Sequence, residues 1–560
     1  MTRILRLATL VVLAPLVSPP SSVAGAQETL PMKHSGGPTQ TAITAADAMT
    51  RLYIFADDSM MGRRAGAPGD FKGTSYIERE VRRLGLVPGG DNGTFFQAVP
   101  LYTRALDFQS PLSADETPLM GGQDYLPIHP EAGTARSLNG VQVVYVGNGS
   151  DTTNLAPAAA GEGKAVMFSG PTGPVARRYR GAVAYLIIRP DETLGQVRNY
   201  IANKSQHMRG ADDTARVAMS IFVPTGSVDK ILGVPLANAR PGTIGRTLRG
   251  DIRYQVEDLG ARNVVAIIPG SDANLRKQYV AIGSHSDHEG IRPQGPLDHD
   301  SLRAFNKAVE KIYVGRTNQL PGSPGSGATA EERATIKLNL DSLRRLRPAR
   351  PDSIYNGADD DGSGAVGMLE IAEKFAGAAV KPRRSLLFVW HTGEESGLFG
   401  ARHFTDFPTV PRDSIVAQLN IDMIGRGEAA DIPGGGPDYV QLLGSRRMST
   451  EFGDLIEDVN KSPSNSFRLD YTFDASGHPQ QYFCRSDHYE YARYGIPIVF
   501  MSTGSHSEYH QVTDEPQYIS YSKLAKVSSF LADVAERVAD LDHRVVVDKP
   551  KPDPKGQCVQ

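Results

Sequence analysis

The sequence predicts an α/β fold in which helices cover both faces of a mostly parallel central sheet. Strongly apolar runs recur from about residue 278 onward, and helical patterns lie between them; the runs are 279–283, 385–390, 416–421 and 496–501. Continuous apolar runs of this length are typical of strands that are buried on both faces of a parallel sheet. Their alternation with helices indicates an α/β layout.

The clearest helical pattern follows the stretch NGADDDGSGA, residues 356–365. Its apolar positions fall on one helical face: Val366, Leu369, Ala372 and Ala376. Ser363 stands at the start of this pattern, where a serine side chain commonly caps the first turn. The sequence therefore predicts a helix that begins directly after three consecutive aspartates.

Length and composition predict more than one domain. The chain has 560 residues, of which 40% are hydrophobic and 22% are charged, which is an ordinary globular composition. Between 115 and 250, short apolar runs alternate with glycine-rich turns, which is typical of a separate β-rich module. This module would divide the main domain into an N-terminal segment, 40–114, and a larger part, 251–540.

Both ends of the chain have distinctive compositions. Residues 1–26 combine a basic start, a short apolar run and a small-residue cleavage site, which predicts an export signal and a mature protein that is periplasmic or secreted. No later segment is long and apolar enough to predict a membrane helix. Residues 541–560 are rich in lysine and proline and predict a disordered tail. Cys484 and Cys558 are the two cysteines, and the sequence leaves open whether they pair.

The charge balance argues against one class of partner. The formal net charge is −3, from 60 Lys and Arg against 63 Asp and Glu. Nucleic-acid-binding proteins need a basic surface to contact phosphates. We therefore expect no nucleic-acid partner.

Polar side chains follow each of the apolar runs. Ligand sites in open α/β sheets form beyond the carboxyl ends of the strands. The residues that follow the four runs offer oxygen and imidazole ligands: Ser284 to Asp287, His391 to Glu395, Asp422, and Tyr509 with His510. Each one alone is more often a surface or helix-capping residue. Their coincidence at one sheet edge, together with the three aspartates, favours a metal site.

At this edge the sequence resembles the co-catalytic zinc aminopeptidases of peptidase family M28. The motifs that carry the resemblance stand in the family's order: GSHSDHEG, NGADDDGSGA, HTGEESGLFGARHF, LNIDMIGRG, CRSDHYEYARYGIPIVF and EYHQVTDEP. They cover nearly all of 255–520. The stretch from MMGRRAGAPG to FFQAVPL resembles the family's N-terminal segment, and the module at 115–250 resembles, in general pattern, the protease-associated domain that many members carry. The resemblance implies the zinc-exopeptidase, phosphorylase/hydrolase-like fold.

The resemblance implies two zinc ions per chain. His285 and Asp422 would bind one ion, Glu395 and His510 would bind the other, and Asp360 would bridge both. Imidazole and carboxylate are ligands that zinc prefers, and co-catalytic ions lie about 3.5–4 Å apart, within reach of one bridging carboxylate. Asp359 and Asp361 have no ligand role in the family pattern. We expect them to make loop and helix N-terminal hydrogen bonds.

Three further residues have catalytic roles implied by the resemblance. Glu394 would be the general base, which takes a proton from water and passes it to the leaving amine. Asp287 would accept the other ring N–H of His285. Tyr509 would either donate a hydrogen bond to the developing oxyanion or pack as an aromatic beside a ligand. His288, His391 and the stretch from Ser486 to His488 are interpreted as supporting residues.

The implied activity is release of N-terminal, mainly apolar, residues from peptide substrates. The same metal centre would also suit a carboxypeptidase or a dipeptidase, because it does not specify which end of the peptide is held. A single-zinc acyltransferase similar to glutaminyl cyclases, and a binding module without catalysis, also stay open. The sequence does not predict the oligomeric state or the preferred side chain.

Residues 289–353 form an insertion that departs from the simpler family pattern. Asp360 stands 75 positions after His285 (360 minus 285), and the intervening sequence predicts two amphipathic helices, at 300–312 and 328–346. Their apolar faces comprise Leu302, Phe305, Val309 and Ile312, and Leu340, Leu343 and Leu346. Because both ends of the insertion join implied ligand loops, we expect it to cover or border the mouth of the catalytic pocket. There it would narrow the entrance and favour short peptides or pack against a second subunit; a surface elaboration without catalytic effect also stays open.

Overall fold

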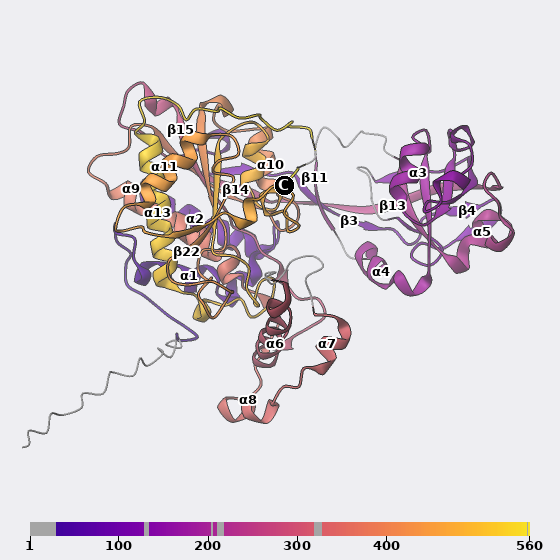
Figure 1. Cartoon of the computed structure of the whole chain (residues 1–560), viewed down its shortest axis with the longest axis horizontal. Coiled ribbons are helices and arrows are strands. Elements are labelled where there is room, and N and C mark those ends of the chain that lie inside the picture. Colours follow the sequence, from indigo (N-terminus) through magenta and orange to yellow (C-terminus); the bar gives the residue numbers. More distant parts are fainter. Residues whose placement is uncertain (1–29, 128–133, 203–204, 210–217, 318–327, 557) are drawn as a thin grey trace, which may run out of the picture.

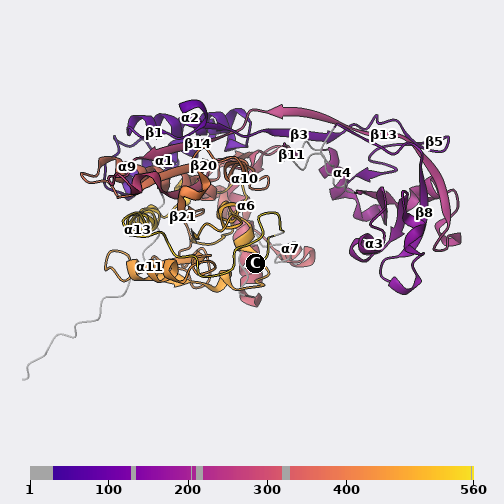
Figure 2. The ribbon, with the colours of Figure 1, turned by 90° about the horizontal axis from the view of Figure 1, so that it is seen from above.

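The computed structural model describes residues 30–127, 134–202, 205–209, 218–317, 328–556 and 558–560. The predicted export signal at 1–26 lies outside the described residues. Figure 1 shows a larger body that holds most of the helices and a smaller body reached by strands β3 (Leu101–Leu106), β11 (Ser205–Met208) and β13 (Ile244–Leu259). Figure 2 shows the same strands as the connection from a second direction. Within the described residues, no helix is long and apolar enough to cross a membrane.

The central sheet of the larger body confirms the predicted fold class. The four apolar runs form its adjacent strands β20 (Ser385–His391), β15 (Tyr279–His285), β21 (Ile415–Ile421) and β24 (Ile498–Ser502), and these strands are mutually parallel. The flanking strands are β14 (Arg262–Ile268), β1 (Val87–Pro88) and β2 (Phe96–Ala98) on one side and β22 (Tyr439–Leu443) and β23 (Arg468–Asp470) on the other. Every residue of β20, β21 and β24 is buried. Because both faces of these strands are covered, their sequences are continuous apolar runs.

Helices cover both faces of this sheet, as the sequence predicts. One face packs against α1 (Ala45–Phe55), α2 (Pro68–Arg83), α9 (Gly364–Gly377), α11 (Thr450–Asn460) and α13 (Tyr521–Ala539). The other face packs against α10 (Phe399–Asp406) and α12 (His488–Ala492). Successive strand residues point to opposite faces, so Phe388 of β20 contacts the first group of helices and Leu387 the second.

The predicted helix after the aspartates is α9, although its cap differs from the expectation. Ser363 stands at the N-cap position but its side chain makes no capping hydrogen bond. Its hydroxyl instead donates to the carbonyl oxygen of Asp359 at 2.8 Å and accepts from the N–H of Ile424 at 2.9 Å. The prediction of a side-chain cap is therefore wrong, because Ser363 is used to join two loops.

The smaller body contains an eleven-stranded sheet built from residues 101–259. Its main path runs β11, β3, β13, β8 (Val141–Asn148), β9 (Ala165–Ser169), β10 (Ala184–Arg189), β12 (Met219–Pro224) and β6 (Leu126–Pro127), with β4 (Leu112–Ala114), β5 (Thr117–Leu119) and β7 (Ala135–Ser137) beside it. A second core of buried apolar side chains lies in this body. The predicted module at 115–250 falls within this span, and its likeness to a protease-associated domain stays a prediction.

The insertion at 289–353 emerges from a paired stem. β16 (Gly290–Ile291) pairs with β19 (Ile354–Tyr355), and β17 (Leu297–Asp298) pairs with β18 (Pro351–Asp352). Beyond the stem lie α6 (His299–Thr317), α7 (Ala330–Thr335) and α8 (Leu340–Leu346), which project from the larger body in Figure 1.

The second predicted helix of the insertion is in fact two short helices. Thr329 caps α7, and the Asn339 side chain accepts a hydrogen bond from the N–H of Ser342 and starts α8. A capping asparagine competes with continuation of a helix, so the prediction of one helix over 328–346 is wrong. The leucines of α8 do not form a buried face, because Leu340 is 49% and Leu346 is 82% exposed.

The C-terminal residues pack against the larger body, contrary to the predicted disordered tail. Cys558 forms a disulfide with Cys484. Gln560 is buried, and its side chain accepts a hydrogen bond from the N–H of Phe483 at 3.0 Å. The tail is ordered by these contacts with residues distant in sequence, which its own composition does not reveal.

Candidate metal centre

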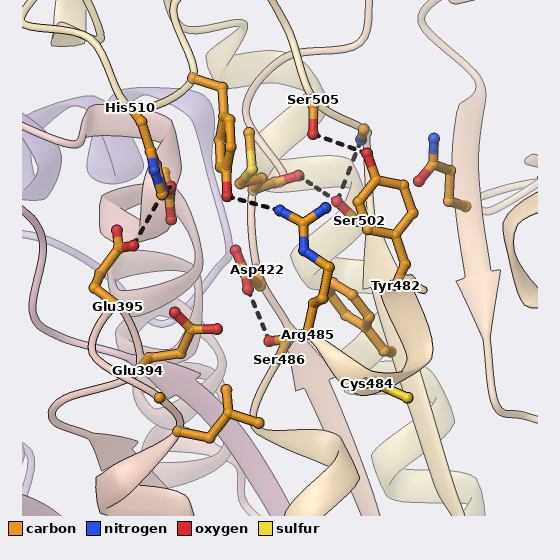
Figure 3. A pocket seen from close by; sticks show the side chains of 18 residues that line it. Glu394, Glu395, Asp422, Tyr482, Cys484, Arg485, Ser486, Ser502, Ser505 and His510 are labelled. Carbon is orange, nitrogen blue, oxygen red and sulfur yellow. Dashed lines mark hydrogen bonds and ion pairs between the residues drawn. The ribbon is translucent and has the colours of Figure 1, made fainter. Parts of the chain in front are cut away.

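The carboxyl ends of the parallel strands bring the predicted ligands together. His285 is the last residue of β15, Asp422 follows β21 directly, and Glu394 and Glu395 lie in the turn after β20. Asp360 comes from the turn before α9, and His510 comes from the loop that follows β24. Figure 3 shows Glu395, Glu394, Asp422 and His510 around one pocket.

The first predicted ligand set is compact and buried. His285 Nε2 lies 3.2 Å from Asp360 Oδ1 and 3.8 Å from Asp422 Oδ1. One atom from each of the three side chains lies within 4.8 Å of the others, a spacing at which they could hold one ion.

The second predicted set uses the other oxygen of Asp360. His510 Nε2 lies 3.1 Å from Asp360 Oδ2 and 3.0 Å from Glu395 Oε2. Asp360 therefore presents one carboxylate oxygen to each set. This is the arrangement that a bridging ligand requires.

The hydrogen bonding at these atoms fits a metal centre. His285 Nε2, His510 Nε2 and Asp360 Oδ2 are buried, and none has a hydrogen-bond partner among the described residues. A buried polar atom without a partner costs free energy unless something else satisfies it. Imidazole nitrogen and carboxylate oxygen are ligands that suit zinc, so these residues could hold two such ions.

The orientation of His285 differs in one detail from the prediction. Its Nδ1 lies 3.1 Å from the backbone carbonyl oxygen of Asp287 and 3.8 Å from the Asp287 carboxylate. The carbonyl is therefore the acceptor that fixes the ring, with the proton on Nδ1 and the lone pair on Nε2. The Asp287 carboxylate instead accepts the backbone N–H of Glu394 at 3.2 Å. It holds the turn that carries the two glutamates.

Two neighbours of the second set were not predicted as ligands. His288 Nδ1 lies 2.5 Å from Glu395 Oε1, and Glu289 Oε1 lies 3.7 Å from His510 Nδ1. Both could take part in metal binding, since each belongs to a group of three closely spaced ligand atoms. Both residues are part of the motif GSHSDHEG. The sequence does not reveal that the turn after β15 brings them to Glu395 and His510.

Asp359 and Asp361 tie the ligand loops together, as their interpretation as loop residues requires. Asp361 accepts the backbone N–H groups of His285 and Met423, each at 3.1 Å. Asp359 accepts the N–H of Gly425 at 2.6 Å. The aspartates on either side of Asp360 therefore connect the turn before α9 to the ends of β15 and β21.

The supporting residues from the sequence lie behind the first set. Ser486 donates a hydrogen bond to Asp422 Oδ2 at 2.7 Å. His391 Nδ1 lies 3.1 Å from Asp487 Oδ2, and the buried ring of His488 stacks on Phe500. These contacts orient Asp422 and the strand ends without adding a ligand.

The two adjacent glutamates have opposite electrostatic environments. Burial raises the pKa of Glu394 well above its usual range; His285 opposes this and Asp422 adds to it. Burial and Asp360 also act to raise the pKa of Glu395, but His510 and His288 outweigh them and lower it to about 2. Paired carboxyl groups whose pKa values are pushed apart are suited to different tasks, here proton transfer for Glu394 and anionic contact for Glu395.

A cavity of about 310 Å³ adjoins the two ligand sets. Its lining also includes the apolar side chains of Leu398, Met423 and Phe500 and the ring of Tyr482. Figure 3 shows Arg485 and Tyr482 in the lining of the same pocket. Among the described residues, the lining of this cavity contains none from 289–353, and of the insertion Glu289 lies beside the second ligand set, 3.7 Å from His510.

Comparison with known proteins finds a family model that is similar to part of the chain. Residues 331–535 match the model of peptidase family M28. The chain is 42% identical over 167 residues to a vacuolar membrane protease from Verticillium alfalfae, covering 29% of this chain and 16% of that protein. It is 30% identical over 179 residues to leucine aminopeptidase 1 from Coccidioides posadasii, covering 30% of this chain and 43% of that protein. The chain thus spans less than half the length of these two relatives.

Among solved structures, an aminopeptidase from Aneurinibacillus sp. strain AM-1 is similar. The TM-score is 0.46 and the sequence identity is 17%, with 91% of this chain and 97% of that chain covered.

Proposed function

We propose that the protein is a zinc-dependent aminopeptidase that acts on peptides, because residues 331–535 match the model of peptidase family M28. The observation that carries the proposal is the position of Asp360 between two sets of imidazole and carboxylate ligands, with Glu394 beside them. The name of the relative leucine aminopeptidase 1 supports removal of N-terminal residues.

Two zinc ions per chain are the metal content that the ligand sets favour. His285, Asp360 and Asp422 would hold one ion, and Asp360, Glu395 and His510 would hold the other. Zinc bound there would act as a Lewis acid on the peptide carbonyl and lower the pKa of water.

The chain's own side chains would move protons and stabilise charge. Glu394 would accept a proton from the attacking water and return it to the leaving amine. Tyr509 would donate a hydrogen bond to the oxygen on which negative charge develops. The apolar side chains of Met423, Leu398 and Phe500 in the pocket lining would contact the side chain of the released residue, which favours apolar N-terminal residues.

Digestion of one peptide in two forms tests the proposal. A peptide of about six residues with an apolar N-terminus is incubated with the zinc-loaded protein, once with a free and once with an acetylated N-terminus, and products are identified by mass spectrometry. We expect stepwise N-terminal release from the free form only, and none by the Glu394→Gln protein. C-terminal release from the acetylated form would favour a carboxypeptidase, and cleavage of dipeptides alone a dipeptidase.

Metal stoichiometry separates the remaining alternatives. Elemental analysis is expected to find two zinc ions per chain. One ion per chain, together with cyclisation of an N-terminal glutamine peptide, would favour the acyltransferase. Two ions without turnover of any peptide would favour a binding module.

Export of the protein is part of the same proposal. The Cys484–Cys558 disulfide supports it, because stable disulfides are typical of oxidising compartments outside the cytoplasm. Fractionation of the expressing cells, followed by sequencing of the mature N-terminus, is expected to find the protein in the periplasm or medium. A cytoplasmic, unprocessed protein would contradict export.

A further inference from the structure

Helix α6 of the insertion contacts the loop that carries Tyr509 and His510. We propose that α6 holds this loop in its metal-binding position, with Arg303 as the positioning residue. The inference rests on the proposed metal centre. It gives the insertion a structural role, which is to restrain the loop that carries two residues of that centre.

The central contact is an ion pair. Arg303 Nε lies 2.9 Å from Glu508 Oε1, and the Glu508 side chain is completely buried. A buried carboxylate depends strongly on its charged partners, because removal of one leaves charge that water cannot solvate. Glu508 directly precedes Tyr509 and stands two positions before His510, so fixing its side chain restricts both of those residues.

The ion pair continues as a buried chain of charged groups toward the other ligand loop. Glu508 Oε2 lies 3.0 Å from Arg426 Nη2 and 3.4 Å from His506 Nδ1. The other nitrogen of His506 lies 3.1 Å from Asp359 Oδ2. Because Asp359 directly precedes Asp360, Arg303 stands at one end of a chain of contacts that reaches the proposed bridging ligand.

Further contacts attach α6 to the same segment. Asn306 Nδ2 donates to Gln511 Oε1 at 3.4 Å, and the guanidinium of Arg303 stacks 3.7 Å from the centre of the Tyr518 ring. His299, the first residue of α6, lies within 3.4 Å of Glu515 and 3.2 Å of the Tyr518 hydroxyl. The helix therefore follows the segment from Glu508 to Tyr518 over much of its length.

His299, Asp352 and Glu515 form a group of closely spaced ligand atoms, and their contacts anchor this helix. His299 Nδ1 contacts Asp352 Oδ2 at 2.9 Å and its Nε2 contacts Tyr518. Arg350 Nη1 lies 3.5 Å from Glu515 Oε2 and supplies positive charge. A hydrogen-bonded contact between the stem of the insertion and the loop accounts for all three side chains.

His510 has a backbone conformation that needs support from its neighbours. His510 has a φ of 55°, in the left-handed region that a non-glycine residue adopts at a cost, and its side chain is 32% exposed. A metal ligand in such a position needs neighbours that hold it, and loss of such neighbours commonly weakens metal binding about 10- to 100-fold. The contacts of α6 are suited to supply that restraint.

Arg303→Met tests the proposal, with Arg303→Lys as the conservative variant and Arg345→Met as the matched control. Arg345 lies on α8 in the same insertion, is exposed, and its one described hydrogen bond is to Ser342. Hydrogen–deuterium exchange of each metal-free protein reports on the loop without any metal or activity. Zinc titration against a chromogenic chelator reports on the two sites separately.

We expect Arg303→Met to speed exchange in 505–515 by on the order of tenfold and to weaken one of the two zinc sites 10- to 100-fold. Arg303→Lys should recover most of both effects, and Arg345→Met should match the unchanged protein. Unchanged exchange in 505–515, or an equal increase throughout the chain, would overturn the proposal. If the unchanged protein binds no zinc, the proposed function fails, while the exchange data still decide whether α6 restrains the loop.

Discussion

Arg485 donates a hydrogen bond from Nη2 to the phenol oxygen of Tyr509 across 3.2 Å. Both residues line the same pocket as Glu394 and Glu395, and Figure 3 shows Arg485 in that lining. Burial raises the pKa of Tyr509 well above its usual range, and Asp360 and Glu395 act in the same direction. The hydroxyl therefore stays protonated, and because it accepts from Arg485, its own proton is left to donate into the pocket.

We predict that Tyr509→Phe lowers kcat by about 10²–10³-fold, the usual effect of removing one donor to a developing oxyanion, with a much smaller change in KM. Steady-state kinetics on an N-terminal leucine substrate measure this. Tyr482→Phe is the matched control, because its hydroxyl contacts Ser505 at 3.1 Å on the same pocket. Near-normal turnover by Tyr509→Phe would instead identify Tyr509 as a packed aromatic.

Substitution of each of the two adjacent glutamates should have a different effect. Glu394→Gln is expected to keep both metals and to lower kcat by about 10²–10⁴-fold, because proton transfer is lost and no ligand is removed. Glu395→Gln should lower the zinc content. Elemental analysis beside steady-state kinetics distinguishes the two effects, and a metal-deficient Glu394→Gln protein would require their roles to be exchanged.

Substitution of the shared ligand should affect both metals. Asp360→Asn removes the carboxylate that contacts His285 and His510, so zinc content should fall from two ions towards none. His285→Ala should remove mainly one ion. Zinc analysis after dialysis at a fixed free-zinc concentration measures both variants, and a full complement in Asp360→Asn would contradict the bridging role.

The buried strands and their ends could be predicted from the sequence because each carries a local signal. A strand buried on both faces needs apolar side chains at consecutive positions, and 385–390 and 416–421 meet that requirement. Polar residues directly after such a strand must lie at the sheet edge. The positions of His285 and Asp422 at this edge could therefore be predicted from the sequence alone.

The remaining features depend on contacts between residues distant in sequence. The acceptor for the His285 ring is a backbone carbonyl, which no side-chain pattern records. Arg303 and Glu508 are 205 positions apart (508 minus 303), and neither stands in a motif that indicates the other. The ordered C-terminal residues depend in the same way on Cys484, 74 positions before Cys558.

The Cys484–Cys558 disulfide should contribute substantially to stability. It closes a loop of 74 residues, and in the chain-entropy account a loop of that length stabilises the folded state by about 4 kcal/mol. Thermal unfolding of the Cys484→Ser, Cys558→Ser protein is expected to begin at a clearly lower temperature. Dithiothreitol should lower the Tm of the unchanged protein and leave the double variant unaffected. Two reactive thiols in the native, unreduced protein would contradict the pairing.

His506 should make stability depend on pH in the alkaline range. Burial and Arg426 oppose its charged form, but Asp359 and Glu508 outweigh them and raise the pKa of His506 to about 10. A histidine whose pKa is raised on folding stabilises the folded state fully below its unfolded pKa of about 6.5, and this stabilisation is lost as the pH rises to about 10. In metal-free protein, the Tm difference between the unchanged chain and His506→Gln should therefore be largest near pH 6 and shrink steadily towards pH 10. His543→Gln is the control, because that histidine is 54% exposed and pairs with Glu451 at the surface. A Tm difference for His506→Gln that stays constant from pH 6 to pH 10 would mean that the ring is not charged in the folded protein.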